Sequence, residues 1–410
     1  MNSWTLLVLG TCVIYTTGQP VNSGDKVPVL KEAPAEVLFR EGQATRLECA
    51  TEGDDSGVEY SWRKDGMHFS VGQDTLTTID AGSLVFSQTK ASDEGEYQCF
   101  AKSDFGVAST RATKLRRTYI ETPAFEEKKV TVVEGKPFEL RCPVPGGYPK
   151  PTISWMRHHD EDGSTENFMD RRATYSPEGT LYFSNASLDD ANDKTKLVCM
   201  ASSPAADEGV PVVTYYITQV TPASEPTYGE LIPQYLSDHV VAKVGDLTYL
   251  YCIYGGTPLA HPSWSKDGVN VDNTYKDRIT RHNRSSGRRL VIKEVWAEDA
   301  GTYTCDVDNQ AGRRLQHTIT FSVVSAPTFT TKPEKRTLAT QGEDVTIPCK
   351  ATGIPSPLVS WTYNGEPVTE GVTGDGLVIK AVSKSNQGYY GCTASNEHGA
   401  EYAETALQVA

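Results

Sequence analysis

The sequence predicts an all-β protein made of four tandem two-sheet sandwich domains, and three observations support this. The chain has 410 residues, which is too long for one hydrophobic core and fits three or four domains. Eight of its nine cysteines fall into four pairs 43 to 57 residues apart, each with a tryptophan 12 or 13 residues after the first cysteine. The segments around these anchors alternate apolar and polar residues between Gly, Pro, Asn and Asp, as short β-strands do.

The cysteines indicate disulfides rather than metal or redox chemistry. Cys12 lies in the apolar N-terminal segment, and no remaining pair has the C-x-x-C spacing of a zinc or thiol-exchange site. An even number in a chain with an export signal is typical of a disulfide framework. The eight remaining cysteines are Cys49, Cys99, Cys142, Cys199, Cys252, Cys305, Cys349 and Cys392.

The period of the anchors is that of whole domains. Tryptophans stand at Trp62, Trp155, Trp264 and Trp361, and a glycine precedes each first cysteine by seven residues. A repeat of about 100 residues is an array of domains, not a solenoid of small units. A Cys…Trp…Cys framework on short strands is the pattern of the immunoglobulin sandwich, in which a disulfide joins two sheets and the tryptophan covers it. The cysteines are therefore expected to pair in sequence order.

A seven-residue phrase before each second cysteine marks a recurring corner. It reads DEGEYQC, DAGTYTC and NQGYYGC in three domains, with Tyr97, Tyr303 and Tyr390 two residues before the cysteine. That is the position of the tyrosine corner. The second domain has DKTKLVC, with Leu197 in place of the tyrosine, and its Leu181 lies three residues further from the cysteine than its counterparts. We expect a looser E–F region there.

The predicted boundaries are a signal peptide at 1–18 and domains at 19–117, 118–222, 223–325 and 326–410. The apolar run 6–15 is too short to span a bilayer, and Thr16 and Gly18 suit cleavage after Gly18. No later run of 18 apolar residues and no hydrophobic C-terminal tail occurs, so we expect a secreted, extracellular protein without a membrane anchor.

The junction between domains 2 and 3 is longer than the other two by about ten residues. It contains Pro222, Pro226, Gly229 and Pro233, which suit an extended linker at 223–236. Such a linker lets domains 3 and 4 fold back on domains 1 and 2, and it equally suits two independent pairs. Asp65-Gly66 and Asp267-Gly268, each in a KDG sequence, predict tight turns, with a shared partner loop as the alternative.

These features resemble the hemolins, insect hemolymph immune proteins of the immunoglobulin superfamily that are related to the L1/neuroglian adhesion molecules. The resemblance rests on the four domains, the KDG turns and the long middle junction, and it covers the chain after the signal. It implies a horseshoe with domain 1 against domain 4 and domain 2 against domain 3. It also implies binding to lipopolysaccharide, lipoteichoic acid and hemocytes, with calcium-assisted homophilic adhesion. A soluble developmental adhesion or decoy factor without a microbial ligand is the alternative.

Charge and motifs exclude several other functions. With 39 Lys and Arg against 53 Asp and Glu, the net charge is −14, which opposes general nucleic-acid binding. No hydrolase, metalloprotease or P-loop motif occurs, so no enzyme is expected. The acidic or His-rich runs 158–162 and 189–193 lack ordered ligand spacing, so loops are expected there and no protein metal site is predicted.

One segment reverses the acidic balance. Residues 278–289, RITRHNRSSGRR, contain no acid, and arginine forks match phosphate oxygens. Lipopolysaccharide and lipoteichoic acid both carry phosphates. We hypothesise an anion-binding surface, with a solvent-facing strand pair as the alternative. Its residues are Arg278, Arg281, Arg284, Arg288 and Arg289. The groups Arg171–Arg172 and Lys114, Arg116 and Arg117 are weaker candidates.

Two N-glycosylation sequons occur, at Asn185 and Asn283. Asn283 lies inside the basic segment, where a glycan could shield the arginines or replace them as the contact. Its Arg- and Ser-rich surroundings favour exposure, so Asn283 is the stronger prediction.

Overall fold

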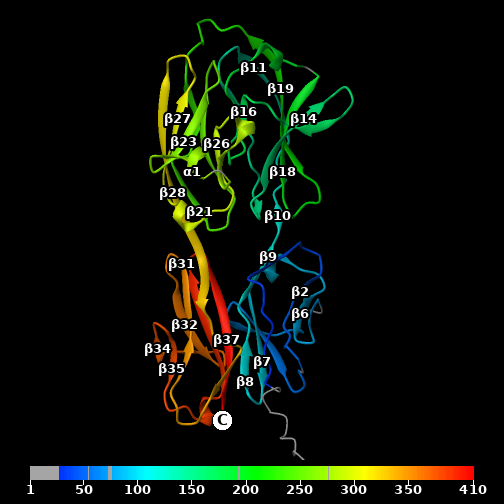
Figure 1. Ribbon diagram of the computed structural model, residues 1–410. Helices are drawn as coiled ribbons and strands as arrows, with labels where there is room; N and C mark the ends of the chain where they lie inside the picture. Colours follow the sequence, from blue (N-terminus) through cyan, green and yellow to red (C-terminus); the bar gives the residue numbers. More distant parts are fainter. Residues whose placement is uncertain (1–26, 54, 73–75, 193, 276) are drawn as a thin grey trace, which may run out of the picture.

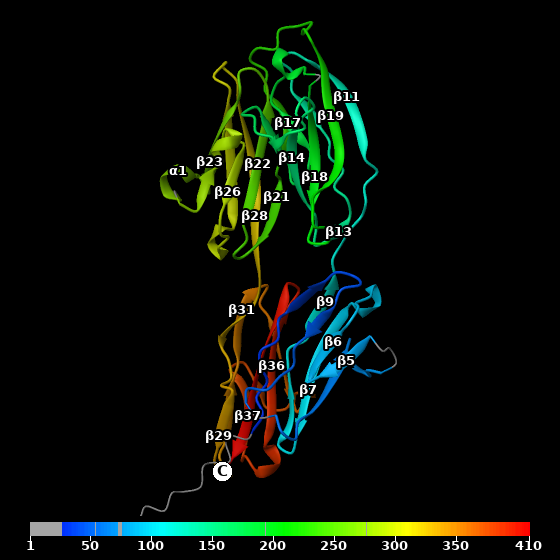
Figure 2. The same ribbon diagram turned by 90° about the vertical axis from the view of Figure 1, so that its right-hand side faces the viewer.

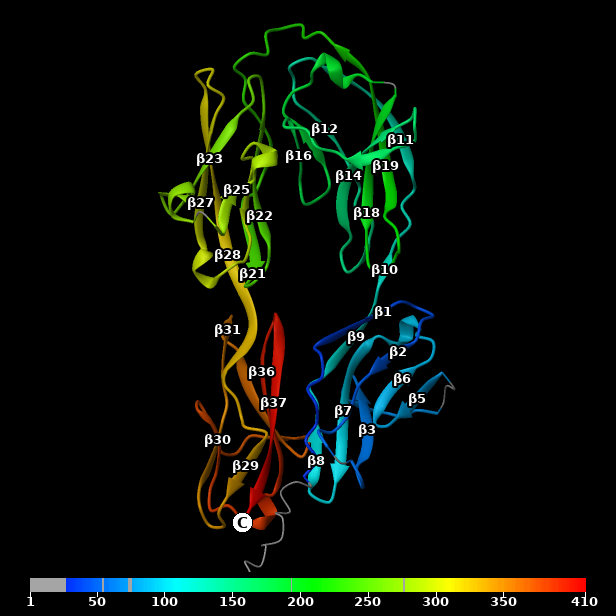
Figure 3. The ribbon, with the colours of Figure 1, turned by 45° about the vertical axis from the view of Figure 1, so that its right-hand side comes forward.

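The computed structural model describes residues 27–410 except residues 54, 73–75, 193 and 276. Four β-sandwiches form a horseshoe in which domain 1 lies beside domain 4 and domain 2 beside domain 3 (Figures 1 and 3). The horseshoe is therefore confirmed, and the arrangement of two independent pairs is wrong. The predicted signal peptide at 1–18 lies outside the described residues.

Domain 1 packs a sheet in the order β1-β9-β7-β3-β4, with β8 paired to β7, against the sheet β2-β6-β5. Trp62 and the Cys49–Cys99 disulfide lie between the two sheets, and the indole donates a hydrogen bond to the carbonyl of Gly82 at 2.9 Å. The strands are β1 (Glu36–Phe39), β2 (Thr45–Leu47), β3 (Glu59–Lys64), β4 (Met67–Phe69), β5 (Thr77–Asp80), β6 (Ser83–Phe86), β7 (Gly95–Ser103), β8 (Gly106–Ser109) and β9 (Thr113–Arg117).

Domain 2 follows after one residue and has the sheets β11-β19-β18-β14-β15 and β12-β17-β16. Its core holds Trp155 and the Cys142–Cys199 disulfide. The strands are β10 (Tyr119–Ile120), which pairs with β13 (Gly147–Tyr148), then β11 (Glu126–Val133), β12 (Phe138–Leu140), β14 (Thr152–His159), β15 (Thr165–Asn167), β16 (Ala173–Tyr175), β17 (Leu181–Phe183), β18 (Thr195–Ser202) and β19 (Val210–Thr221).

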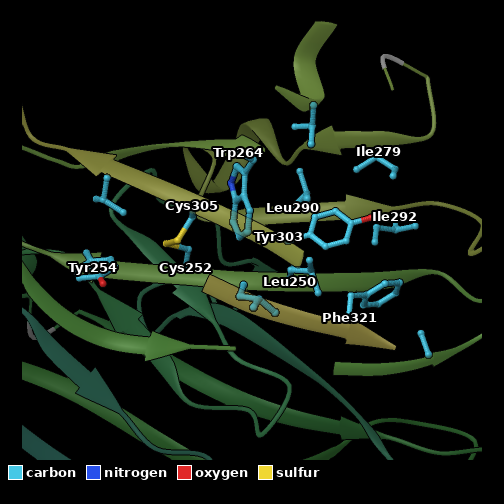
Figure 4. Close-up of a cluster of buried hydrophobic side chains, with 14 of the residues drawn as sticks. Leu250, Cys252, Tyr254, Trp264, Ile279, Leu290, Ile292, Tyr303, Cys305 and Phe321 are labelled. Atoms are coloured by element: carbon cyan, nitrogen blue, oxygen red, sulfur yellow. A yellow bond between two sulfur atoms is a disulfide. The ribbon is translucent and has the colours of Figure 1, made fainter. Parts of the chain in front are cut away.

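Domain 3 has the sheets β20-β22-β26-β25 and β21-β28-β27-β23-β24. Figure 4 shows Trp264 against the Cys252–Cys305 disulfide, with Tyr303 among Leu250, Leu290 and Ile292. The elements are β20 (Ile232–Leu236), β21 (His239–Lys243), β22 (Thr248–Gly255), β23 (His261–Lys266), β24 (Val269–Asn270), α1 (Val271–Thr274), β25 (Ile279–Arg281), β26 (Arg289–Ile292), β27 (Gly301–Asp308) and β28 (Arg314–Thr331).

Domain 4 has the sheets β29-β37-β36-β32-β33 and β30-β35-β34 around Trp361 and the Cys349–Cys392 disulfide. Strand β28 runs into it without a break and pairs with β31, so it joins the two halves of the horseshoe on one side while the chain around β10 joins them on the other (Figure 2). The strands are β29 (Arg336–Ala339), β30 (Val345–Pro348), β31 (Lys350–Ile354), β32 (Leu358–Tyr363), β33 (Glu366–Val368), β34 (Val372–Thr373), β35 (Gly376–Ile379), β36 (Gly388–Asn396) and β37 (Gly399–Val409).

All four predicted disulfides are present, and the tyrosine corner is built in three domains. Tyr97, Tyr303 and Tyr390 each donate a hydrogen bond to the backbone carbonyl four residues upstream, at 2.8 to 3.1 Å. The KDG turns are also confirmed, because Asp65 and Asp267 have φ of 51° and 49° and each precedes a glycine with positive φ. This is the pattern of a type I′ hairpin turn.

Domain 2 keeps the turn at the start of the E–F region, for which a looser arrangement is predicted. A 3₁₀ turn at Leu188–Asp190 occupies the place of the corner, and Asp190 accepts two hydrogen bonds from Arg172 at 2.7 and 2.8 Å. Asp190 lies nine residues after Leu181, as Asp93 does after Leu84 in domain 1, so the three extra residues follow Asp190 and leave the turn intact. Asp193 lies outside the described residues.

The predicted linker at 223–236 extends too far. Residues 232–236 form β20, which pairs with β22 as the edge strand of a domain-3 sheet. Pro233 is compatible with this position because an edge strand leaves one row of backbone N–H groups unpaired. The connection between the domains is therefore shorter than the proline spacing suggested.

Candidate functional site

Arg288 lies in the seam between domains 2 and 3 and is completely buried, with an exposed fraction of 0%. Its Nε donates to Thr174 Oγ1 at 3.0 Å, one terminal nitrogen donates to Ser184 Oγ at 2.7 Å, and the other donates to the carbonyl of Arg171. These acceptors are uncharged and all belong to domain 2. Burial lowers the pKa of Arg288 to about 10, so the guanidinium remains charged at neutral pH and fastens domain 3 to domain 2.

Aromatic rings surround this contact. The guanidinium of Arg289 lies 5.2 Å from the ring centres of both Tyr175 in domain 2 and Tyr249 in domain 3, a cation–π arrangement across the seam. Burial, and the charge of Arg289 beside it, lower the pKa of His282 to about 4. His282 is therefore neutral at physiological pH. A further apolar cluster contains Tyr182, Tyr235, Tyr249, Tyr251 and Ile253.

Arg278 has an internal role. It pairs with the buried carboxylate of Asp299 and stacks on Trp296 at 3.9 Å. This repeats the Arg172–Asp190 pair of domain 2, because Asp299 and Asp190 both end a 3₁₀ turn before the second cysteine strand. Three of the five predicted ligand-binding arginines, Arg278, Arg288 and Arg289, therefore do not form a free anion-binding surface, because their guanidinium groups already have partners in the fold.

The remaining two arginines lie at the edge of the seam. Arg281 and Arg284 are exposed, and so is Arg171 of domain 2. Ser286 Oγ, two residues from Arg284, donates to the carbonyl of Arg171 at 3.4 Å. We call Arg171, Arg281 and Arg284 the seam rim. Arg281 pairs with Asp272 at 2.8 Å, whereas Arg171 and Arg284 form no ion pair with any residue that the structure describes.

The two sequons differ in their surroundings. Asn283 is exposed beside the seam rim. Asn185 is half-buried in the seam, and its Nδ2 donates to the carbonyl of Gly256 in domain 3 at 2.9 Å. A glycan on Asn185 would break this contact between the domains, so the geometry favours Asn283 as the acceptor.

The weaker candidates other than Arg171 are already paired. Lys114, Arg116 and Arg117 form ion pairs with Glu96, Glu36 and Glu41 in turn, at 2.9 to 3.6 Å. Asp160 in the run 158–162 pairs with Lys196 at 3.2 Å, and Asp190 pairs with Arg172. Within the described residues no three His, Cys, Asp or Glu side chains are grouped as metal ligands.

The seam between domains 1 and 4 contains a carboxyl group, that of Glu404, that the sequence did not indicate. Glu404 Oε2 accepts hydrogen bonds from the Ser109 amide at 2.9 Å and from the Tyr402 hydroxyl at 2.8 Å. Burial raises the pKa of Glu404 to about 7, although the bonds from Ser109 and Tyr402 oppose the rise. The carboxyl borders a cavity of about 360 Å³ between the two domains, which Arg111 and Lys335 also line.

The rest of this seam combines apolar and polar contacts. Tyr389 and Ala406 of domain 4 are buried in one cluster with the domain-1 core, and the Tyr389 ring lies 5.4 Å from the Phe105 ring. Tyr389 of domain 4 donates a hydrogen bond to the carbonyl of Pro28, and Arg63 lies 4.5 Å from the Phe100 ring while it pairs with Glu366 at 3.1 Å. Lys335 pairs with Glu52 as well. Domains 1 and 4 meet through their β7–β8 and β36–β37 sheets, whereas domains 2 and 3 meet through the opposite sheets of their sandwiches.

Comparison with known proteins identifies the family. The immunoglobulin domain model matches residues 27–103, 123–203 and 326–396, and the immunoglobulin I-set model matches residues 232–323. Hemolin of Manduca sexta is 48% identical over 416 residues, which covers 100% of both chains. The chain belongs to the hemolin family.

A solved structure supports the arrangement as well. A crystal structure of hemolin, described there as an insect immune protein whose domain arrangement has implications for homophilic adhesion, matches with a TM-score of 0.88 and 47% identity. It covers 94% of this chain and 100% of the other. Neuroglian of Drosophila melanogaster is 35% identical over 99% of this chain and 32% of its own length. The chain is thus an immunoglobulin-superfamily protein of immunity and adhesion.

Hemolins as a family of immunoglobulin-domain proteins are non-enzymatic in general. In the described part of the chain, no helix has the length and apolar character needed to cross a lipid bilayer.

Proposed function

We propose that this protein is secreted into the hemolymph, recognises phosphate-bearing bacterial surface molecules and mediates adhesion to hemocytes and to itself. Lipopolysaccharide and lipoteichoic acid are the proposed ligand classes. The seam rim supports this function, because it places three exposed arginines on segments of domains 2 and 3 that contact each other, in a chain with net charge −14. Two of the three have no ion pair among the described residues, so their hydrogen-bond donors are available to phosphate oxygens.

The buried arginines support the rim without binding ligand. Arg288 fixes the backbone of Arg171 through a hydrogen bond to its carbonyl, and this sets the distance between Arg171 and the domain-3 arginines. A single domain would present only part of the rim. Recognition would therefore require the folded-back arrangement of domains 2 and 3, which ties the proposed ligand site to the horseshoe.

Binding of the glycosylated protein to lipopolysaccharide, with and without its phosphates and across a salt series, tests this proposal. We expect the double variant Arg171→Ala/Arg284→Ala to bind at least about tenfold more weakly, because hydrogen bonds to charged groups contribute about 1.5–3 kcal/mol each. The matched control is Arg313→Ala/Arg314→Ala, which removes the same charge from the tip of the β27–β28 hairpin. Equal weakening by both variants would indicate only long-range attraction.

The alternative is a developmental adhesion or decoy factor without a microbial ligand. The likeness to neuroglian over 99% of the chain favours it. Absence of lipopolysaccharide and lipoteichoic acid binding at micromolar protein would support this alternative, and an Asn283→Gln variant would then show whether a glycan at that sequon is the contact with cells. Calcium dependence of self-association would support carboxylate bridging between copies.

A further inference from the structure

In each domain, one sheet includes the strand that carries the second cysteine. The four domains differ in the side chains on the outer face of this sheet. Domains 1 and 4 bury these faces against each other. In domain 3 the side chains beside Trp264 and Cys305 on that face are Ser265, Thr304 and Asp306, all polar. The same positions in domain 2, beside Trp155 and Cys199, hold Met156, Val198 and Met200.

The apolar side chains of domain 2 form a continuous surface. On the outer face of the sheet, side chains from paired strands lie side by side in four rows. Trp155, Leu197 and Cys199 alternate with them along the strands and point inward. The rows are Lys129, Tyr216, Lys196 and His158, then Glu127, Thr214, Val198 and Met156, then Pro211, Met200 and Ser154, and last Ser202 and Thr152. The second and third rows are therefore the apolar ones.

These rows line a groove of about 480 Å³ that also includes Phe125, which is 52% exposed. Figure 3 shows β14, β18 and β19 on the side of domain 2 turned away from domain 3, so neither seam of the horseshoe covers the groove. We call Phe125, Met156, Val198, Met200 and Pro211 the domain-2 face. An apolar sheet face of this kind marks an interaction site.

We propose that the domain-2 face binds the same face of a second copy of this chain, related by a two-fold axis that sets the strands of the two copies antiparallel. This proposal rests on the proposed homophilic function, and it identifies the domain-2 face as the surface through which two copies bind. The pairing of domain 1 with domain 4 shows that two such sheets of this chain pack face to face. An identical face on each partner is what a two-fold dimer requires.

The charges along the face fit this antiparallel arrangement. The first row carries Lys129 and Lys196, although Lys196 also pairs with Asp160. The exposed Glu208 precedes the fourth row at Gly209. An antiparallel two-fold axis lays the first row of each copy over the fourth row of the other, so Lys196 approaches the partner's Glu208 while Val198 packs on the partner's Met200. A parallel arrangement would put like charges together.

The size of the face sets the expected strength. Five strands and four rows span about 20 Å in each direction, so two copies would bury roughly 800 Å² in total. This area is below the roughly 1,200 Å² of stable specific interfaces and falls among weak, transient ones. We therefore expect a reversible dimer at tens to hundreds of micromolar protein. Adhesion between surfaces that carry many copies would then depend on multiple weak contacts.

Sedimentation equilibrium of the full secreted protein tests the proposal, with Val198→Lys as the variant. We expect wild type to dimerise and Val198→Lys to raise the dissociation constant at least about tenfold. The matched control is Thr304→Lys, the same position in domain 3, which should dimerise as wild type does. Lys196→Glu should weaken the dimer, and combining it with Glu208→Lys should restore it, which a loss of folding could not do.

If wild type dimerises and Val198→Lys dimerises equally well, homophilic adhesion stands and the assigned face is wrong. If wild type stays monomeric at several hundred micromolar, both homophilic adhesion and the assignment of the face to a second copy fail. If hemocyte binding, measured by flow cytometry, falls in Val198→Lys while wild type stays monomeric, the face serves a cell-surface protein and the second copy is overturned. Lipopolysaccharide binding should be unchanged in every one of these variants.

Discussion

The seam between domains 2 and 3 buries aromatic rings and a fully enclosed arginine, whereas the seam between domains 1 and 4 buries a carboxyl group beside a cavity. Both close the same horseshoe, yet they respond to solution conditions differently. Arg288 remains charged throughout the physiological range, with neutral partners that do not titrate. Glu404 changes charge near neutral pH. One seam is therefore fixed, and the other can be weakened by a rise in pH.

Replacing Arg288 with Met should have the largest effect on this contrast. The variant leaves the hydroxyls of Thr174 and Ser184 and the carbonyl of Arg171 without their donor, and unsatisfied buried polar groups cost about 1–3 kcal/mol each. We expect the first urea transition to lose about 3 kcal/mol or more. Arg284→Met, on the exposed rim, should change it by less than about 0.5 kcal/mol. Equal effects of the two substitutions would contradict the role assigned to Arg288.

The pH dependence of the other seam is the next largest effect. The pKa of Glu404 in the closed seam is about 7, above its ordinary value of 4.5, so the closed state favours the protonated carboxyl. Its stabilising contribution is complete below pH 4.5, declines as the pH rises toward 7 and changes little above that. One pKa unit corresponds to about 1.4 kcal/mol, so protonation of Glu404 stabilises the closed seam by at most about 3 kcal/mol. The actual value is smaller because the carboxyl borders a cavity that solvent can enter.

The substitution Glu404→Gln should remove this pH dependence and stabilise the protein at pH 7.5, as thermal unfolding between pH 4.5 and 8.5 would show. Glu401→Gln is the control, because Glu401 is a half-buried carboxylate of the same seam that pairs with Arg111 at 3.5 Å. A Glu404→Gln profile with the wild-type slope would mean that another group carries the pH response.

Tyr389→Phe should produce the smallest of these changes. It removes one hydroxyl that donates to the Pro28 carbonyl across the seam, and such a bond contributes about 1 kcal/mol. Thermal unfolding at pH 6 should show the loss. Tyr228→Phe, whose ring is 70% exposed in the linker region, should show none. A larger loss than in Arg288→Met would reverse the proposed order of the two seams.

The fold was predictable because its signals are local and repeated. The spacing from Cys49 to Trp62 and the tyrosine before each second cysteine define a sandwich without any knowledge of other domains. The sequence could not predict the features that depend on contacts between distant segments. Arg288 appears in the sequence as one of five similar arginines, and its burial depends on Thr174 and Ser184, more than 100 residues away.

The candidate site was located only in part for the same reason. Arg281 and Arg284 of the basic segment are exposed, and their binding of an anion stays a prediction. The sequence could not show that Arg278 is held by Asp299, since that pair lies inside one sandwich. Glu404 carries no sequence signal, because a glutamate alternating with apolar residues in a terminal strand is ordinary. Comparing aligned positions among the four domains would have revealed Val198 and Met200 where domain 3 has Thr304 and Asp306.

Hydrogen exchange at two backbone amides tests most directly whether the seams differ as described. The Gly256 amide donates across the seam between domains 2 and 3 to the Ser184 carbonyl at 2.6 Å, and the Ser109 amide donates across the other seam to Glu404 at 2.9 Å. At pH 7.5 we predict at least about tenfold less protection for Ser109 than for Gly256, with the gap narrowing in Glu404→Gln. Equal protection of both amides, or weaker protection of Gly256, would contradict a fixed seam opposite a pH-sensitive one.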